Sequence, residues 1–253
     1  MVLRKFVKSV LLIGLVAGLG ACAQTQGNGD LAKADPFEET NRFFHQNNLR
    51  LDRNVLRPAA QGYGYVTPTL FKHMIGNGLS HLELTRDFAN YLLQGDVDRS
   101  LETLGRFTLN TIVGAGGLLD PATEFGLPRE PTDFGMTLGR YGVGEGGYLV
   151  LPLLGATTVR DAAGYAVDRA FSPTSYLGPF IAADGISPAV TVLGLVHRRD
   201  KRADLIDDVL YNSPDSYVTI RSAYLQRRRA QIAGEDGAEE LLPDIFDDEA
   251  AKE

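Results

Sequence analysis

The sequence predicts an all-α protein with a single folded domain over residues 35–233. Apolar residues recur at intervals of three and four, for example at Val97, Leu101, Leu104 and Phe107, which places them on one face of a helix. Helix-capping sequences, in which an aspartate or serine precedes a proline, begin the first and last predicted helices. Glycine-rich segments lie between helices, where we expect irregular backbone.

The first 21 residues have the layout of a secretory signal peptide, with a basic start, a short apolar run and small residues at the end. Cys22 follows and is the only cysteine of the chain. This ending resembles a bacterial lipobox, although an ordinary signal peptide followed by a chance cysteine is an alternative. We expect cleavage before Cys22 and a covalent diacylglycerol and acyl chain on it. Ala23, in place of an aspartate, favours sorting to the outer membrane.

Two polar segments flank the predicted domain. Residues 22–34 are small and polar, as expected of a tether for the lipid anchor. Residues 234–253 contain nine acidic residues and one lysine, which predicts a disordered tail. Its apolar patch at 241–246 could dock a partner. Without these acidic residues the domain is close to neutral, so it does not suggest binding to nucleic acid.

The first helix is predicted to begin at Asp35, which stands at the N-cap before a proline, and to end near Leu56. Asn41 and Asn48 recur at the spacing of the apolar stripe of this helix. Two interpretations are open: the amides cap or face solvent, or they are polar groups on an inward face.

The central helices are predicted at residues 68–76, 79–93 and 97–112, with Gly95 ending the second and Asp96 capping the third. We expect their apolar stripes to face the core, as such stripes usually do.

Residues 118–140 are rich in proline and glycine, which predicts a loop. Thr157 or Thr158 can cap a helix over residues 159–171. The neighbouring Arg160–Asp161 pair is either a surface ion pair, of small energetic value, or an anchor for the glycine-rich segment before it.

Two further helices complete the prediction. A long helix begins at Pro188 or Ala189 and ends near Leu210, and the last one begins after an N-cap at Ser213. The last helix ends in three arginines at 227–229, which either favour the helix dipole or meet lipid head groups.

The stretch from Tyr141 to Gly155 combines four glycines within residues 142–147 with an apolar run that ends at Gly155 and is too short to span a bilayer. Its glycines match the pattern Gly-x-Gly-x-x-Gly, but no strand is predicted before them and Pro152 interrupts the apolar run after them. In a chain with 28 glycines a chance match is expected, so we reject a nucleotide site.

This stretch, with other pieces in the same order, resembles the MlaA/VacJ family of outer-membrane lipoproteins between about residues 35 and 230. The matching pieces are Asp35–Glu38, Asn41–Arg42, Arg57–Pro58, Asn77–Ser80, Asn90–Asp96, Arg106–Phe107, Leu109–Ile112, Gly116–Gly117, Tyr141–Pro152, Thr158–Asp161, Ser213–Tyr217 and Arg221–Arg227.

The resemblance implies a ring of helices around an amphipathic channel, lying in the inner leaflet of the outer membrane. It implies that mislocalised phospholipid is removed from the outer leaflet and passed to a periplasmic carrier, MlaC, so that lipid asymmetry is maintained. Many members of the family associate with trimeric porins, so the resemblance also makes a trimeric porin a candidate partner.

We expect the stretch to form part of a lipid passage, with glycine backbone and a tyrosine near the polar part and leucines near the acyl chains. The alternative is that the glycines are turn residues and the leucines are core. The expected passage residues are Gly142, Gly144, Gly146, Gly147, Tyr148, Leu149, Leu151, Leu153 and Leu154.

The sequence contains no motif for catalysis. The Gly-x-Ser-x-Gly and His-Glu-x-x-His patterns are absent, and the four histidines have no paired metal spacing. We therefore expect no enzyme, no metal and no cofactor. The alternatives are a lipid-anchored periplasmic hydrolase, which needs a cluster of perturbed titratable groups, and a purely structural envelope lipoprotein.

Overall fold

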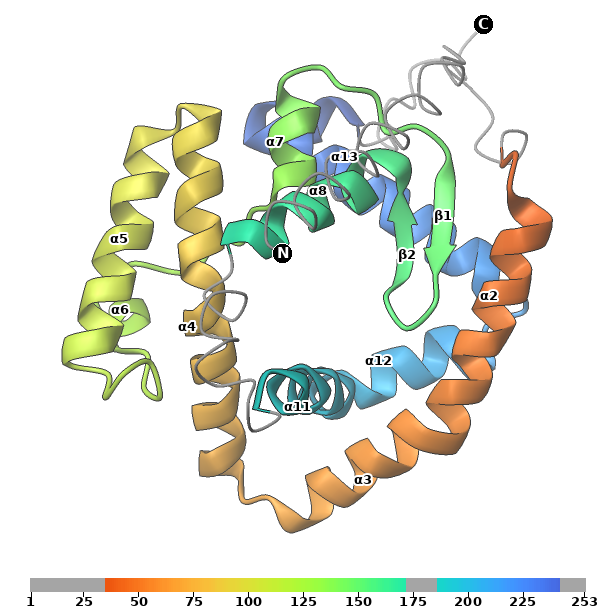
Figure 1. The fold of residues 1–253 in the computed structure, drawn as a ribbon, viewed down its shortest axis with the longest axis horizontal. Helices are drawn as coiled ribbons and strands as arrows, with labels where there is room; N and C mark the ends of the chain where they lie inside the picture. The colour runs from red at the N-terminus through yellow and green to blue at the C-terminus, as the bar shows by residue number, and fades with distance from the viewer. Residues whose placement is uncertain (1–34, 172–185, 242–253) are drawn as a thin grey trace, which may run out of the picture.

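The computed structural model describes residues 35–171 and 186–241, so Cys22, the predicted tether and residues 242–253 lie outside it. Its helices form a ring (Figure 1). Helices α2 (Glu38–Leu51), α3 (Arg57–Val66) and α4 (Thr69–Gln94) follow one another around three sides. The fourth side consists of α7 (Phe134–Arg140), α8 (Val159–Phe171) and α13 (Ser216–Leu241).

Two further pairs of helices lie beside these four sides of the ring. Helices α11 (Ile186–Lys201) and α12 (Ala203–Asp207) lie along its lower edge, and α5 (Val97–Ile112) and α6 (Pro121–Glu124) stand outside α4 as an arm (Figure 1). The all-α prediction is confirmed. No described helix has both the length and the apolar character needed to cross a membrane.

The predicted end of the first helix at Leu56 is wrong. A π-helical turn over Asp52–Leu56 connects α2 to α3, and the helical backbone continues past Pro58 to Val66. A proline clashes with the carbonyl four residues earlier in an α-helix. The wider turn directly before Pro58 lets the backbone pass it and bends the chain around the ring.

Helix α4 is also longer than predicted, because it runs without a break through the glycines at 76 and 78. Gly76 lies against the His197 ring of α11, and a Cβ at this position would come within 2.8 Å of His197 Nε2. Gly76 therefore permits close helix packing and does not end the helix. The predicted end is confirmed at Gly95, which has a left-handed φ of 74°.

Local capping sequences were informative further along the chain. Asp96 caps α5 as predicted, by accepting the backbone N–H of Arg99 at 3.2 Å. The predicted loop over residues 118–140 contains two short helices, α6 and α7, which Asp120 and Asp133 cap in the same way. Aspartate is a preferred N-cap residue, so these two aspartates indicate helix starts that the loop prediction missed.

The C-terminal helices differ from the prediction at their ends. The predicted long helix is interrupted at Arg202, which separates α11 from α12, and a π-helical turn over Asp208–Asn212 follows. Asp215, and not Ser213, accepts the first backbone N–H groups of α13. Helix α13 continues beyond the arginines to Leu241, with a break at Gly234 where the tail was predicted to begin.

The second half of the stretch from Tyr141 to Gly155 belongs to a β-hairpin, which the sequence did not predict. Strand β1 (Tyr148–Leu151) pairs with β2 (Gly155–Thr158) in an antiparallel register that sets Tyr148 opposite Thr158. The turn of the hairpin points into the ring (Figure 1). Thr158 Oγ1 then accepts the N–H of Asp161, so the predicted cap of α8 is confirmed.

Candidate functional site

The hairpin divides the expected passage residues between a buried and an open side. Tyr148 and Val150 are 3% and 4% exposed and pack with Tyr217 and Leu225 of α13. Leu149 and Leu151 alternate with them and are half-buried. Tyr148 is therefore a core residue, while the two leucines lie on the opposite face of the strand.

The turn carries the most exposed members of the expected passage set. The side chains of Leu153 and Leu154 are 65% and 54% exposed. Among the glycines, Gly142 and Gly144 border open space, whereas a Cβ at Gly147 would come within 2.9 Å of the Phe37 ring and would displace it. A passage wall at the turn is thus compatible with these contacts, and the strand base is core.

Helix α2 holds the outer edge of β1 through two asparagines. Asn41 Nδ2 donates to Tyr148 O at 2.9 Å, and Asn41 Oδ1 accepts from Val150 N at 2.8 Å. Asn48 repeats the pattern with Leu151 O and Leu153 N, both at 2.9 Å. Each amide therefore satisfies the two backbone groups that a neighbouring strand would otherwise bond.

The spacing of these asparagines matches the strand. Seven residues of α-helix rise by about 10.5 Å, and three residues of strand by about 10 Å, so each amide meets the hairpin one bonding unit further along. Asn41 is only 2% exposed. The interpretation of the asparagines as inward polar groups is thereby confirmed.

The glycine-rich segment before β1 is anchored from below by α8. Arg160 N donates to Glu145 O at 3.2 Å, and the Arg160 guanidinium donates to Val143 O at 3.4 Å. Arg160 and Asp161 are 8% and 7% exposed. The pair is therefore the anchor of the glycine segment and not a surface ion pair.

Asp161 is also the centre of a buried charge cluster. It accepts from Tyr224 Oη at 2.6 Å and from Arg228 Nε at 2.9 Å, and Arg228 also binds Asp133 at 2.8 Å. Burial acts to raise the pKa of Asp161, but the hydrogen bonds from Arg228 and Tyr224 outweigh it and lower that pKa to about 2. The cluster joins α7, α8 and α13 with its charges paired.

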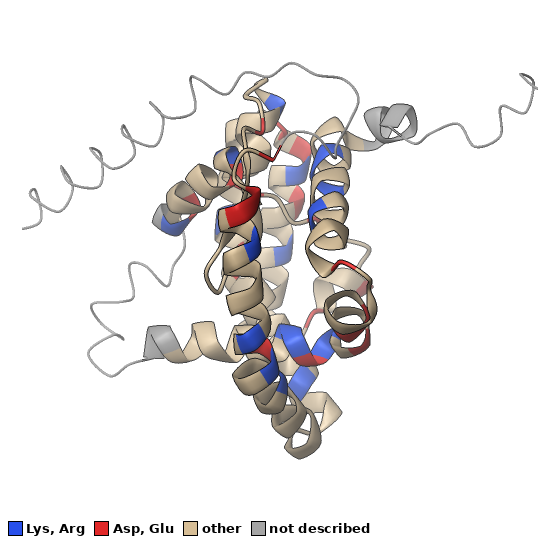
Figure 2. Cartoon of the chain, turned by 90° about the vertical axis from the view of Figure 1, so that its right-hand side faces the viewer, with Lys and Arg blue, Asp and Glu red and all other residues tan. Residues whose placement is uncertain are grey.

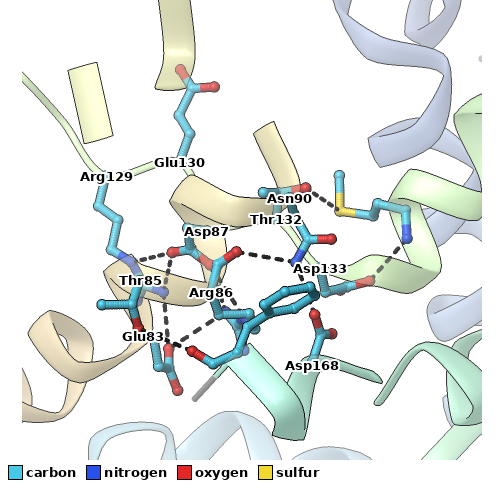
Figure 3. A network of polar contacts seen from close by, with 12 residues as sticks. Glu83, Thr85, Arg86, Asp87, Asn90, Arg129, Glu130, Thr132, Asp133 and Asp168 are labelled. Carbon is cyan, nitrogen blue, oxygen red and sulfur yellow. Dashed lines mark hydrogen bonds and ion pairs between the residues drawn. The ribbon is translucent and has the colours of Figure 1, made fainter. Parts of the chain in front are cut away.

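A second polar network joins α4 to the segment before α7 and to α8 (Figure 3). Asp87, with no exposed surface, binds Arg86 at 2.8 Å and Arg129 at 2.7 Å. Asn90 donates to Asp168 at 2.8 Å, and burial raises the pKa of Asp168 despite this hydrogen bond. Figure 2 shows basic and acidic positions interspersed through the body, as such pairing requires.

Helix α5 exposes its apolar side and buries its polar side, which corrects the expectation that its stripe faces the core. Its exposed apolar residues include Leu101 at 60% and Ile112 at 76%. Arg106, 4% exposed, binds Asp120 at 2.9 Å, and Asn110 binds the same carboxylate at 2.8 Å. The polar contacts hold the arm together, and of its apolar stripe Val97, Leu101 and Leu104 are exposed while Phe107 stacks on His81 of α4.

The described residues offer no catalytic constellation. They contain no group of three or more side chains suited to hold a metal ion. His45 Nε2 lies 2.8 Å from Ser216 Oγ beside a cavity of about 350 Å³, but no described carboxylate holds the other nitrogen of His45. Burial lowers the pKa of His45, and without an orienting acid the pair lacks the usual catalytic arrangement.

Comparison with known proteins identifies the family. The family model for the MlaA lipoprotein matches residues 33–231. The intermembrane phospholipid transport system lipoprotein MlaA of Escherichia coli K12 is 35% identical over 225 residues, which cover 87% of this chain and 86% of the relative. The protein of the same name from Haemophilus influenzae is 32% identical over 249 residues, covering 94% and 96%.

An uncharacterized protein of Rickettsia felis is 36% identical over 206 residues, covering 81% of this chain and 80% of the relative. A solved structure described as "Structural basis for maintenance of bacterial outer membrane lipid asymmetry" superposes with a TM-score of 0.69 at 36% identity, over 79% of this chain and all of the solved one. The chain belongs to the MlaA lipoprotein family.

Proposed function

We propose that this protein is an outer-membrane lipoprotein that removes mislocalised phospholipids from the outer leaflet and passes them to a periplasmic carrier, so that lipid asymmetry is maintained. The observation that carries the proposal is the inverted burial of the body. Apolar side chains such as Leu101, Ile112 and Leu153 are exposed, while Asp87, Asn90 and other polar groups are buried and bonded. This distribution suits a protein surrounded by lipid.

The relatives support the same function. The Escherichia coli and Haemophilus influenzae proteins are named as lipoproteins of an intermembrane phospholipid transport system. The solved relative is described in connection with outer-membrane lipid asymmetry. At about 35% identity over most of both chains, a shared role is the simplest inference.

The proposed location is the periplasmic side of the outer membrane, with the body lying in the inner leaflet. A diacylglycerol and an acyl chain on Cys22 give stable anchoring where one chain alone would not. The ring then lies in the lipid, and no described helix needs to span the bilayer.

The proposed mechanism requires no covalent chemistry and gives no residue a catalytic role. A phospholipid moves through an amphipathic passage inside the ring, with its acyl chains against the leucines of the hairpin turn and its head group near the open glycines Gly142 and Gly144. Irregular backbone at membrane depth is tolerated where it lines such a cavity. The proposed partners are phospholipid, the carrier MlaC and a trimeric porin.

Deletion and complementation test this function. Cells without the protein should accumulate outer-leaflet phospholipid and become sensitive to detergent, and the wild-type chain should reverse both. Mass spectrometry of protein from membranes should find Cys22 as the lipidated N-terminus. A hydrolase would instead release fatty acid or lysophospholipid from vesicles, and that product, with unchanged lipid asymmetry in the deletion strain, would contradict the proposal.

A further inference from the structure

The tip of the hairpin contains a leucine in a conformation that usually belongs to glycine. Leu153 has a φ of 66°, in the left-handed region that a residue with a Cβ rarely adopts. Leu154 N donates to Pro152 O at 2.8 Å, which makes Leu153 the centre of a three-residue turn. With a positive φ at its centre, this is the strained form of the γ-turn.

Packing within the chain does not explain the leucine. Its side chain is 65% exposed, so it contributes little to the core. A glycine would adopt the same backbone without strain, as Gly155 does two residues later with a φ of 80°. Strain of this kind persists where the surrounding structure enforces it, and it concentrates at sites that bind ligands.

Asn48 supplies the enforcement. Its Oδ1 accepts the N–H of Leu153 and its Nδ2 donates to the carbonyl of Leu151, each at 2.9 Å, so one side chain fixes the backbone on both sides of Pro152. Asn41 bonds the base of the same strand, which is already held by the core around Tyr148 and Val150. Asn48 therefore acts on the part of the hairpin that has no core beneath it.

We propose that Asn48 and Leu153 form a latch, in which the Asn48 amide holds Leu153 in its strained conformation and so presents the Leu153 side chain to a phospholipid acyl chain inside the ring. Asn48 is the positioning residue and Leu153 is the lipid-contacting residue. This inference rests on the proposed function and assigns two residues of the passage separate roles.

Leu153→Gly separates the side chain from the fold, because it removes the leucine and the strain while keeping the N–H bonded to Asn48. The unfolding midpoint should equal or exceed that of the wild type, and outer-leaflet phospholipid should rise to the level of cells without the protein. Leu153→Ala should lose transport in the same way. Leu70→Ala is the matched control, since Leu70 is 62% exposed in the first turn of α4, and it should transport normally.

Asn48→Ala tests the positioning role. Amide exchange of Leu153 should accelerate by about five- to tenfold, the change that corresponds to losing one hydrogen bond of typical net strength. Asn48→Asp keeps the acceptor for Leu153 N–H and should restore most of the protection. Asn47→Ala removes a neighbouring amide that accepts a hydrogen bond from Arg50, and should leave the exchange of the tip unchanged.

A lipid probe makes the result independent of cell phenotype. The full lipoprotein is placed in phosphatidylethanolamine–phosphatidylglycerol vesicles that contain a phospholipid with a diazirine at the end of one acyl chain. Photolabel should appear on residues 152–154 of the wild type and fall sharply in Asn48→Ala. If wild-type protein does not restore lipid asymmetry, the proposed function fails, and this labelling still decides the latch.

Three functional or labelling results, and one stability result, would overturn the latch. The first three are normal transport by both Leu153 variants, unchanged tip exchange in Asn48→Ala, and absence of photolabel from residues 152–154. A lower unfolding midpoint for Leu153→Gly would also overturn it, because the leucine would then be shown to support the fold.

Discussion

The arm formed by α5 and α6 and the β1–β2 hairpin use apolar residues in opposite ways. In the hairpin, Tyr148 and Val150 are buried in the core, and polar side chains from α2 bond the edge of the strand. In the arm, Arg106 is buried against Asp120 and Leu101 faces outward. The hairpin base is thus stabilised as in a water-soluble protein, whereas the arm resembles a protein that is surrounded by hydrocarbon.

This contrast locates stability and membrane contact in separate parts of the molecule. Loss of a buried charge beneath the hairpin should unfold the ring, because α7, α8 and α13 meet there. Loss of an exposed leucine from the arm should barely affect folding, because it has few partners within the chain. Three changes, taken in order of decreasing effect on stability, test the contrast.

The first change, Arg228→Met, should destabilise the protein most. Arg228 is 9% exposed and pairs with both Asp133 and Asp161, so its removal takes the ion pair from the partly buried Asp133 and leaves the buried Asp161 with the Arg160 pair. Breaking such a pair from one side costs about 3–5 kcal/mol of unfolding free energy. Chemical unfolding in detergent micelles measures the cost. Arg227→Met, at an exposed neighbouring position, is the control and should change stability by less than about 0.5 kcal/mol.

This cluster also shows what the sequence could and could not predict. The helix caps at Asp96 and Thr158 depend on local chemistry, and both predictions are confirmed. The burial of Arg160 and Asp161 depends on α13, about 60 residues away, so sequence left the surface pair and the anchor as open alternatives. The seven-residue spacing of the α2 asparagines was visible in the sequence, but their partner strand was not.

The errors have the same origin. Gly76 lies in a Gly-x-Gly sequence that is typical of the end of a helix. The helix nevertheless continues there, and Gly76 allows close contact with the His197 ring. The α5 stripe has the periodicity of a core-facing helix, but periodicity does not tell whether protein or lipid covers the apolar side. The contacts of Arg106 and Asn110 show which side of α5 is inside.

The second change is acidification. The pKa of Asp161 is lowered to about 2 in the folded protein, so its contribution to stability is present above the ordinary value near 4 and is lost as the pH falls toward 2. We expect a loss of about 2 kcal/mol between roughly pH 5 and pH 2 from this group. Unfolding measured across this range should show a shallower slope in Asp161→Asn. An identical slope in the two proteins would contradict the assignment of the charge cluster as the acid-sensitive part of the ring.

The third change, Leu101→Ser in the arm, should affect stability least. Leu101 is 60% exposed, so the unfolding free energy in micelles should change by less than about 0.5 kcal/mol. Membrane contact should change far more, because a fully buried leucine contributes about 1.5–3 kcal/mol on transfer out of water. The lipid anchor would mask this loss, so partition into vesicles is measured in a Cys22→Ala background, where only the body binds.

In that background Leu101→Ser should weaken partition by about tenfold or more, the change that corresponds to about 1.4 kcal/mol. Glu102→Ser, at the adjacent exposed position, provides the control for a change on the same helix. Equal partition of Leu101→Ser and the parent would show that the arm faces away from lipid. The apolar stripe of α5 would then need a protein partner to cover it. In that case the difference in burial between the arm and the hairpin would not identify the arm as a lipid-facing surface.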